Sequence, residues 1–151
     1  MSRSEIQVHG TCVALNGNAV LLRGASGSGK SDLALRLIDA GWALVADDRV
    51  NLRRQGMTLI AVAPPTITGR IEVRGLGLVR IDAVPSTQVH LFIDLVGAAD
   101  VKRFPEPAKT EILGLSLQLV KLTPFESSAT SKVRLALGLC VGDIMPGDGD
   151  D

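Results

Sequence analysis

An eight-residue stretch of the sequence has a composition and spacing that suit phosphate binding. Residues 24–31 fit the P-loop pattern G-x-x-x-x-G-K-[ST]. They are Gly24, Ala25, Ser26, Gly27, Ser28, Gly29, Lys30 and Ser31. Glycines let successive backbone N–H groups turn toward one point, and Lys30 adds a positive charge for phosphate oxygens. We therefore expect this stretch to bind a nucleoside triphosphate, with the Ser31 hydroxyl as a ligand of Mg²⁺.

Two adjacent carboxylates follow a short apolar segment. Residues 43–46 are Ala-Leu-Val-Ala, and Asp47 and Asp48 come directly after them. A carboxylate at the carboxyl end of a strand beside a P-loop is the usual second holder of the magnesium ion. The neighbouring carboxylate could accept a proton from an attacking hydroxyl. Asp94 also follows an apolar segment, so the spacing alone leaves Asp47 and Asp94 as alternatives.

Three further polar residues have the chemistry of a site but also a structural alternative. Glu72 and Arg74 alternate before two glycines, so on a strand they would share one face. An acid and a guanidinium together indicate a metal or phosphate contact, and the alternative is a surface ion pair beside a bulge. His9 stands alone on an expected strand and is either an active-site group or a structural histidine.

Apolar periodicity and turn residues predict the elements that must hold these groups. Residues 6–15 and 19–23 are expected to be strands joined by a tight Asn-Gly turn. Residues 30–40 have helical spacing, and Gly41 is well placed to end that helix. Further strands are expected at 43–46, 51–54, 57–63, 89–96 and 115–122, and a second helix at 128–139. Because hairpins interrupt the alternation of strands and helices, the expected fold class is α/β with a mixed sheet.

Composition limits the class of protein. The 151 residues are 46% hydrophobic and 21% charged, which predicts one domain with a packed core. Sixteen basic and sixteen acidic residues balance, which argues against a broad nucleic-acid-binding face. Cys12 and Cys140 lack metal-ligand spacing and are expected to be buried thiols in a reducing compartment.

Location and domain limits are also predicted from the sequence. No signal peptide and no apolar run of roughly 20 residues is visible, so a cytoplasmic protein that does not bind a membrane is expected. The domain is expected to extend over residues 1–145. The acidic, glycine-rich residues 146–151 are expected to be a disordered tail.

Four segments together resemble the C-terminal catalytic domain of HPr kinase/phosphorylase, in a short form that lacks the N-terminal domain. They are residues 8–10 (Val-His-Gly), 24–31, 45–50 (Val-Ala-Asp-Asp-Arg-Val) and 71–77 (Ile-Glu-Val-Arg-Gly-Leu-Gly). The resemblance implies a fold similar to the nucleotide-binding part of phosphoenolpyruvate carboxykinase. It also implies phosphorylation of a serine of HPr, or of an HPr-like phosphocarrier protein, with ATP and Mg²⁺. Phosphorolytic dephosphorylation and a homo-oligomer, a hexamer in many members, are implied in addition.

The resemblance also assigns roles to single residues. Catalytic roles fall, in chain order, on His9, Lys30, Asp48 and Arg103. Asp48 takes the acid/base position, and the resemblance favours the Asp47–Asp48 pair over Asp94. The expected ligands of Mg²⁺ are Ser31, Asp47 and Glu72.

The sequence departs from the family's pattern in a late loop. Residues 122–132 are serine-rich, contain Glu126 and lack the arginines that would hold inorganic phosphate, which argues against phosphorolysis. No aromatic residue can be assigned to adenine stacking from the sequence. Two other functions stay open, namely a P-loop phosphotransferase acting on a small molecule, and a regulatory module that binds ATP and a partner without turnover.

Overall fold

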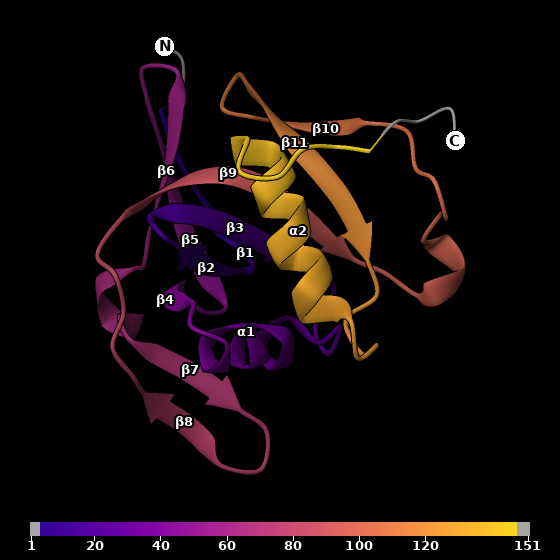
Figure 1. The fold of residues 1–151 in the computed structure, drawn as a ribbon. Coiled ribbons are helices and arrows are strands. Elements are labelled where there is room, and N and C mark those ends of the chain that lie inside the picture. The colour runs from indigo at the N-terminus through magenta and orange to yellow at the C-terminus, as the bar shows by residue number, and fades with distance from the viewer. Residues whose placement is uncertain (1–3, 148–151) are drawn as a thin grey trace.

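The computed structural model describes residues 4–147. Its first elements are β1 (Glu5–His9), β2 (Thr11–Leu15), β3 (Asn18–Arg23), α1 (Lys30–Asp39), β4 (Ala43–Ala46), β5 (Arg49–Gln55) and β6 (Thr58–Val62). They are followed by η1 (Pro65–Ile67), β7 (Arg70–Val73), β8 (Gly77–Arg80), β9 (Thr87–Leu95), η2 (Ala98–Asp100), β10 (Ala108–Ile112), β11 (Leu115–Leu122) and α2 (Ala129–Val141). Figure 1 shows this order along the ribbon.

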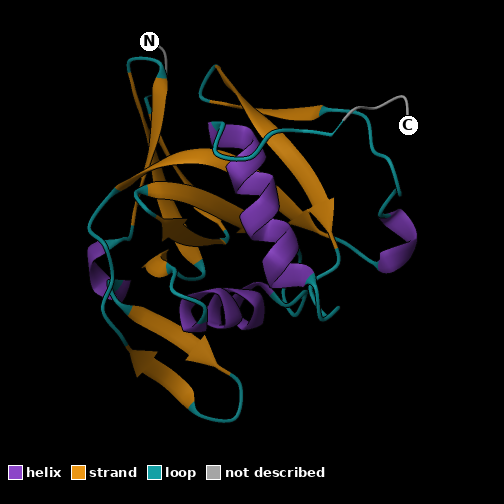
Figure 2. Cartoon of the chain, viewed as in Figure 1, coloured by secondary structure: helices purple, strands orange, loops and turns teal. Residues whose placement is uncertain are grey.

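Strand β9 organises a nine-stranded sheet. The strand order is β1-β5-β6-β9-β3-β2-β4, with β11 paired to β9 and β10 paired to β11. Strand β9 runs parallel to β3 and β11 and antiparallel to β6. The sheet is therefore mixed, and the expected α/β fold class is confirmed (Figure 2).

Both α-helices pack on one face of this sheet (Figure 2). Leu33, Ala34 and Leu37 of α1 are buried at helical spacing and contact the same core as Val133 and Leu137 of α2. The opposite face encloses a second core around Phe92, and among the described residues no α-helix contributes to it. The sheet therefore curls so that its own strands enclose this second core.

The β2–β3 hairpin positions the glycine-rich loop (residues 24–31). Its turn contains Asn16 with φ of 53° and Gly17 with φ of 80°, as the Asn-Gly signal predicts. Strand β3 then runs through the middle of the sheet beside β9 and ends at Arg23. The loop follows directly, and α1 begins at Lys30, the residue at which the sequence predicted it.

Three features of the fold differ from the sequence prediction. The single strand expected at residues 6–15 is wrong, because Gly10 separates β1, which pairs with β5, from β2, which pairs with β3 and β4. A Cβ on Gly10 would lie 2.8 Å from the backbone oxygen of Leu22, so the chain has room only for glycine there. Strand β10 was not predicted, and β7 and β8 form a separate two-stranded sheet (Figure 1).

The remaining expectations concern cysteines, membranes and the tail. Cys12 and Cys140 are both free; Cys12 is fully buried and Cys140 is half-buried. Burial raises the pKa of the Cys12 thiol. In residues 4–147 we find no helix with the length and apolar character needed to cross a bilayer. Most of the predicted tail, residues 148–151, lies outside the described residues.

Candidate active site

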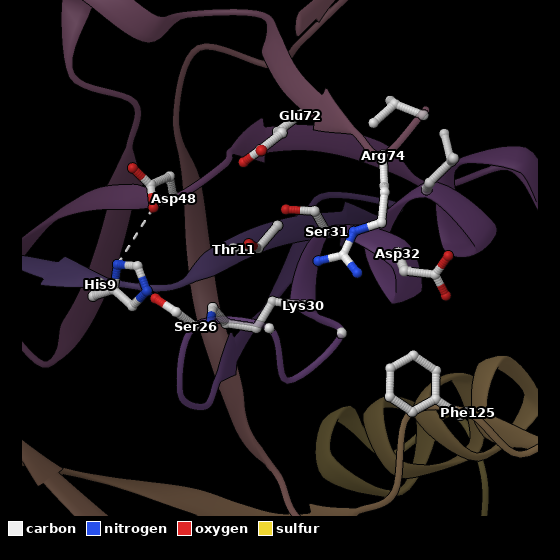
Figure 3. A pocket seen from close by; sticks show the side chains of 14 residues that line it. His9, Thr11, Ser26, Lys30, Ser31, Asp32, Asp48, Glu72, Arg74 and Phe125 are labelled. Atoms are coloured by element: carbon white, nitrogen blue, oxygen red, sulfur yellow. Dashed lines mark ion pairs between the residues drawn. The ribbon is translucent and has the colours of Figure 1, made fainter. Parts of the chain in front are cut away.

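A cavity of about 510 Å³ opens beside the glycine-rich loop. It lies where the loop, the start of α1, the end of β1, the corner after β4 and strand β7 meet (Figure 3). The lining residues are His9, Thr11, Ser26, Gly27, Gly29, Lys30, Ser31, Asp32, Leu35, Asp48, Glu72, Val73, Arg74 and Phe125. Most residues that the sequence predicted for the site therefore meet around one cavity.

The loop has the backbone conformation that its glycines predict. Gly27 and Gly29 have φ of 80° and 98°, in the left-handed region that other residues rarely adopt. The Lys30 ammonium donates hydrogen bonds to the carbonyl oxygens of Gly24 at 2.7 Å and Ala25 at 2.9 Å. Lys30 is only 7% exposed, and this burial lowers its pKa, while the carboxylates of Asp48 and Asp47 act in the opposite direction.

Asp47 lies behind the cavity and is 5% exposed. Its Oδ1 accepts hydrogen bonds from the hydroxyls of Thr11 at 2.9 Å and Ser31 at 2.7 Å. Its Oδ2 accepts one from the backbone N–H of Glu72 at 2.9 Å. Burial of a carboxylate is costly unless it accepts such hydrogen bonds. Through them, Asp47 connects the end of β4 with β2, β7 and the start of α1.

Asp48 has a different environment from its neighbour. Its φ of 72° is in the left-handed region, an uncommon conformation for a residue other than glycine that recurs at functional sites. Its backbone oxygen accepts a hydrogen bond from the N–H of Gly10 at 3.0 Å, and its side chain is 64% exposed at the cavity. Nδ1 of His9 lies 3.4 Å from Oδ1 of Asp48 (Figure 3). His9 thus belongs to the cavity, as the resemblance implied.

Glu72 and Arg74 both extend toward the cavity from β7 and its end (Figure 3). The alternative of an ion pair between them is not formed in the described structure, whose ion pairs involve other residues. An acid and a guanidinium that form no ion pair with each other are both available to a ligand. This geometry is compatible with a metal contact for Glu72 and a phosphate contact for Arg74.

Several candidate residues do not line the cavity. Gly24, Ala25 and Ser28 belong to the loop beside it, and Asp47 contacts three of its lining residues. Asp94 and Arg103 have other surroundings. Asp94, the alternative to Asp47, forms an ion pair with Arg23 through contacts of 2.7 and 3.3 Å, and Arg23 lies over the ring of Phe92. Arg103, which the resemblance made catalytic, is exposed in the segment after η2 and lies over the ring of Phe104. The structure therefore does not bring Arg103 to the cavity, and its catalytic role stays a prediction.

The donor set of the cavity fits a magnesium ion that the substrate helps to bind. Within residues 4–147 there is no cluster of three His, Cys, Asp or Glu side chains that could hold a metal. Mg²⁺ instead takes one or two protein oxygens together with substrate phosphates and water. The Ser31 hydroxyl, the Asp47 carboxylate behind it and the Glu72 carboxylate at the cavity provide oxygens of this kind.

Sequence reasoning missed several residues of the cavity. Thr11 supports Asp47 through a buried hydrogen bond, and no motif marks it. Asp32 and Leu35 are three residues apart near the start of α1, so helical spacing places them on one face and could have indicated them. Phe125 comes from the segment between β11 and α2, and only the folded chain brings it to the glycine-rich loop.

Comparison with known proteins shows the family of this chain. Residues 2–124 match the family model described as HPr Serine kinase C-terminal domain. This chain belongs to that family. The HPr kinase/phosphorylase of Cupriavidus necator is 35% identical to it over 133 residues, which cover 81% of this chain and 41% of that protein. The protein of the same name from Listeria monocytogenes is 46% identical over 77 residues, 50% of this chain and 25% of that protein.

A solved structure supports the same fold. The structure of the Hpr(Ser) kinase/phosphatase from Coxiella burnetii matches with a TM-score of 0.76 at 24% sequence identity. The match covers 91% of this chain and 96% of that one. At this identity the likeness concerns the fold. The matched part of this chain covers only 41% and 25% of the length of these two curated relatives. Family membership alone therefore does not assign the activity of the whole relatives to this chain.

Proposed function

We propose that this chain is an ATP-dependent protein serine kinase that phosphorylates HPr or an HPr-like phosphocarrier protein. The observation that carries the proposal is the meeting of a phosphate-binding motif with an exposed carboxylate in one cavity. Lys30 and Ser31 supply the first part, and Asp48 supplies the second. Membership of the HPr Serine kinase C-terminal domain family supports the choice of a protein substrate.

Binding of the nucleotide would begin at the glycine-rich loop. Its backbone N–H groups and the start of α1 provide partial positive charge for the phosphates. The Lys30 ammonium now donates to the carbonyls of Gly24 and Ala25, so it would exchange these partners for phosphate oxygens. The buried ammonium would then pair with negatively charged oxygens instead of neutral carbonyls. Its charge would stabilise the negative charge of the phosphoryl group during transfer.

Asp48 would act as the base. In the forward reaction the serine oxygen of the carrier attacks the γ-phosphorus, and the bond from this phosphorus to the β–γ bridging oxygen breaks. The serine proton passes to the Asp48 carboxylate. The 64% exposure of this side chain leaves it accessible to a side chain on another protein. His9, 3.4 Å from Asp48, would position that carboxylate.

Ser31, Asp47 and Glu72 would hold the magnesium ion when nucleotide is bound. When it is present, the ion supplies positive charge that neutralises the phosphate oxygens. The Asp47 carboxylate already fixes the Ser31 hydroxyl and the backbone of Glu72, so this residue would keep the two other ligands in position.

The proposed activity is phosphorylation of the carrier, not its phosphorolytic dephosphorylation. In the late loop, Glu126 forms an ion pair with Lys132 of α2, so a cation near the loop is already neutralised. This pairing supports the view that phosphorolysis is weak in this chain. A cytoplasmic location and a homo-oligomer remain predictions from the sequence.

Mass spectrometry of the carrier tests the proposal. The protein is incubated with ATP, Mg²⁺ and the HPr-like carrier of the same cell, with a carrier variant whose acceptor serine is alanine as control. One added phosphate on the wild-type carrier alone is the expected result. Phosphate transfer to a small molecule, or tight ATP binding without any transfer, would instead favour one of the two other functions left open by the sequence.

A further inference from the structure

Phe125 is an exposed aromatic residue at the rim of the cavity. Its side chain lines the cavity, yet the residue is 69% exposed. His9 and Asp48 lie together on one side, whereas Phe125 lies on the opposite side near Asp32 (Figure 3). No other described residue covers this apolar ring. An exposed apolar surface of this kind often marks a site where a ligand or a partner binds.

The backbone around Phe125 is held in place. Pro124 is buried, and its carbonyl oxygen accepts a hydrogen bond from the guanidinium of Arg36 on α1. On the other side, Glu126 pairs with Lys132, and its backbone oxygen accepts from the N–H of Ala129 at 3.1 Å. The exposed ring thus stands on a fixed support between the two α-helices.

The ring also lies directly against the glycine-rich loop. A Cβ on Gly29 would be 2.8 Å from Cζ of Phe125, so only a glycine allows the ring this close to the start of α1. Gly29 comes immediately before Lys30 and Ser31, the residues expected to bind phosphate and the magnesium ion. The aromatic ring is therefore next to the expected phosphate site rather than on a remote surface.

The position of Asp48 sets the direction of a bound nucleotide. The phosphoryl group that is transferred must face the base, which lies on the His9 side of the cavity. The remaining phosphates then follow the loop, and the nucleoside leaves on the opposite side. Phe125 is the aromatic lining residue on that side (Figure 3).

We propose that Phe125 is a stacking platform for the nucleobase, and that it makes this site select a nucleoside triphosphate over a bare polyphosphate. The proposal rests on the proposed function, because it concerns the nucleotide of that same site. Stacking on an aromatic ring tolerates every base, since each base has a π-face. Phe125 therefore determines affinity for a nucleoside rather than the choice of adenine.

Calorimetric titration with two ligands tests this role. Mg-ATP and Mg-tripolyphosphate share the phosphates, and only the first has a base. In Phe125→Ala, the affinity for Mg-ATP is expected to fall roughly 5- to 100-fold, while that for Mg-tripolyphosphate stays the same. Phe125→Trp should retain or exceed the wild-type affinity for Mg-ATP. Met57→Ala, which removes an exposed apolar side chain in the β5–β6 turn, is the matched control and should change neither affinity.

The outcomes separate failure of this proposal from failure of the proposed function. Equal affinities of wild-type protein for the two ligands, or equal losses for both in Phe125→Ala, would overturn the stacking role and leave the phosphate site intact. A variant that binds Mg-ATP normally but requires more carrier protein for half-maximal transfer would assign Phe125 to carrier docking instead. Wild-type protein that binds neither ligand would overturn both proposals.

Discussion

The hydroxyl of Ser31 donates a 2.7 Å hydrogen bond to Oδ1 of Asp47, which joins the first turn of α1 to the end of β4. The next residue along the chain, Asp48, directs its carboxylate into the open cavity instead. The left-handed backbone of Asp48 accompanies this change of direction. Two adjacent aspartates thus have separate tasks, one inside the fold and one at the reacting end of the cavity.

The two aspartates should differ in their effect on stability. Asp47→Ala leaves three donors without an acceptor, namely the buried hydroxyl of Thr11 and the part-buried hydroxyl of Ser31 and N–H of Glu72. We expect the free energy of unfolding to fall by about 2–4 kcal/mol. Asp48→Asn should change it by about 0.5 kcal/mol or less, because that side chain is exposed. Urea denaturation measures both, and equal losses would contradict the division of tasks.

Asp48→Asn should abolish transfer without abolishing nucleotide binding. Asparagine tolerates the left-handed backbone that residue 48 adopts, so the substitution removes the base and preserves the turn. We expect the single-turnover rate of transfer to fall by a factor on the order of 10² to 10⁴. ATP affinity should stay the same or rise, because a negative charge beside the phosphates is removed. Wild-type turnover in this variant would exclude Asp48 as the base.

His9 should act through Asp48. Nδ1 of His9 and Oδ1 of Asp48 are 3.4 Å apart, and both side chains face the cavity. If His9 positions the carboxylate, His9→Ala lowers kcat by roughly 10-fold in the wild-type background. It causes almost no further loss once Asp48 is asparagine. A double-mutant cycle on kcat measures this coupling. Independent losses that multiply would mean that His9 contributes separately from Asp48.

Local signals in the sequence predicted much of the fold. The Asn-Gly turn and the apolar periodicity of residues 30–40 predicted the β2–β3 hairpin and α1, because these elements depend on neighbouring residues. The break at Gly10 could not be predicted in this way, since it depends on contact with the backbone of Leu22 on another strand. Strand β10 was missed for the same reason, because its exposed residues are ordered by pairing with β11.

The candidate site shows the same limit. The motifs of the sequence predicted Lys30, Asp48 and Glu72, and the fold brings all three to one cavity. Phe125 has no motif, because its place depends on how α2 packs beside α1. Arg103 shows the opposite outcome, since the resemblance assigned it a role and the fold leaves it outside the cavity.

Replacement of Gly10 by alanine, which adds only a methyl group, should destabilise the fold. In Gly10→Ala the new Cβ meets the Leu22 backbone oxygen at 2.8 Å, and neither strand can move without breaking sheet pairing. We expect a loss of about 1–3 kcal/mol in the free energy of unfolding. Gly97→Ala is the control, because its Cβ has nothing within 4 Å and its φ of −69° suits alanine. Similar stability of the two variants would show that the strands adapt.

The pH dependence of ATP affinity should report the state of Lys30. Burial lowers the pKa of its ammonium, and the nearby carboxylates of Asp48 and Asp47 only partly oppose this. Since phosphate attracts only the protonated form, affinity is complete below this pKa and declines as pH rises through it. The decline therefore begins at a lower pH than for an ordinary lysine, whose pKa is about 10.4. Lys30→Arg keeps its charge throughout and should lose this decline. Titrations of Mg-ATP from about pH 7 to 10 test this, and the same decline in both proteins would assign it to another group.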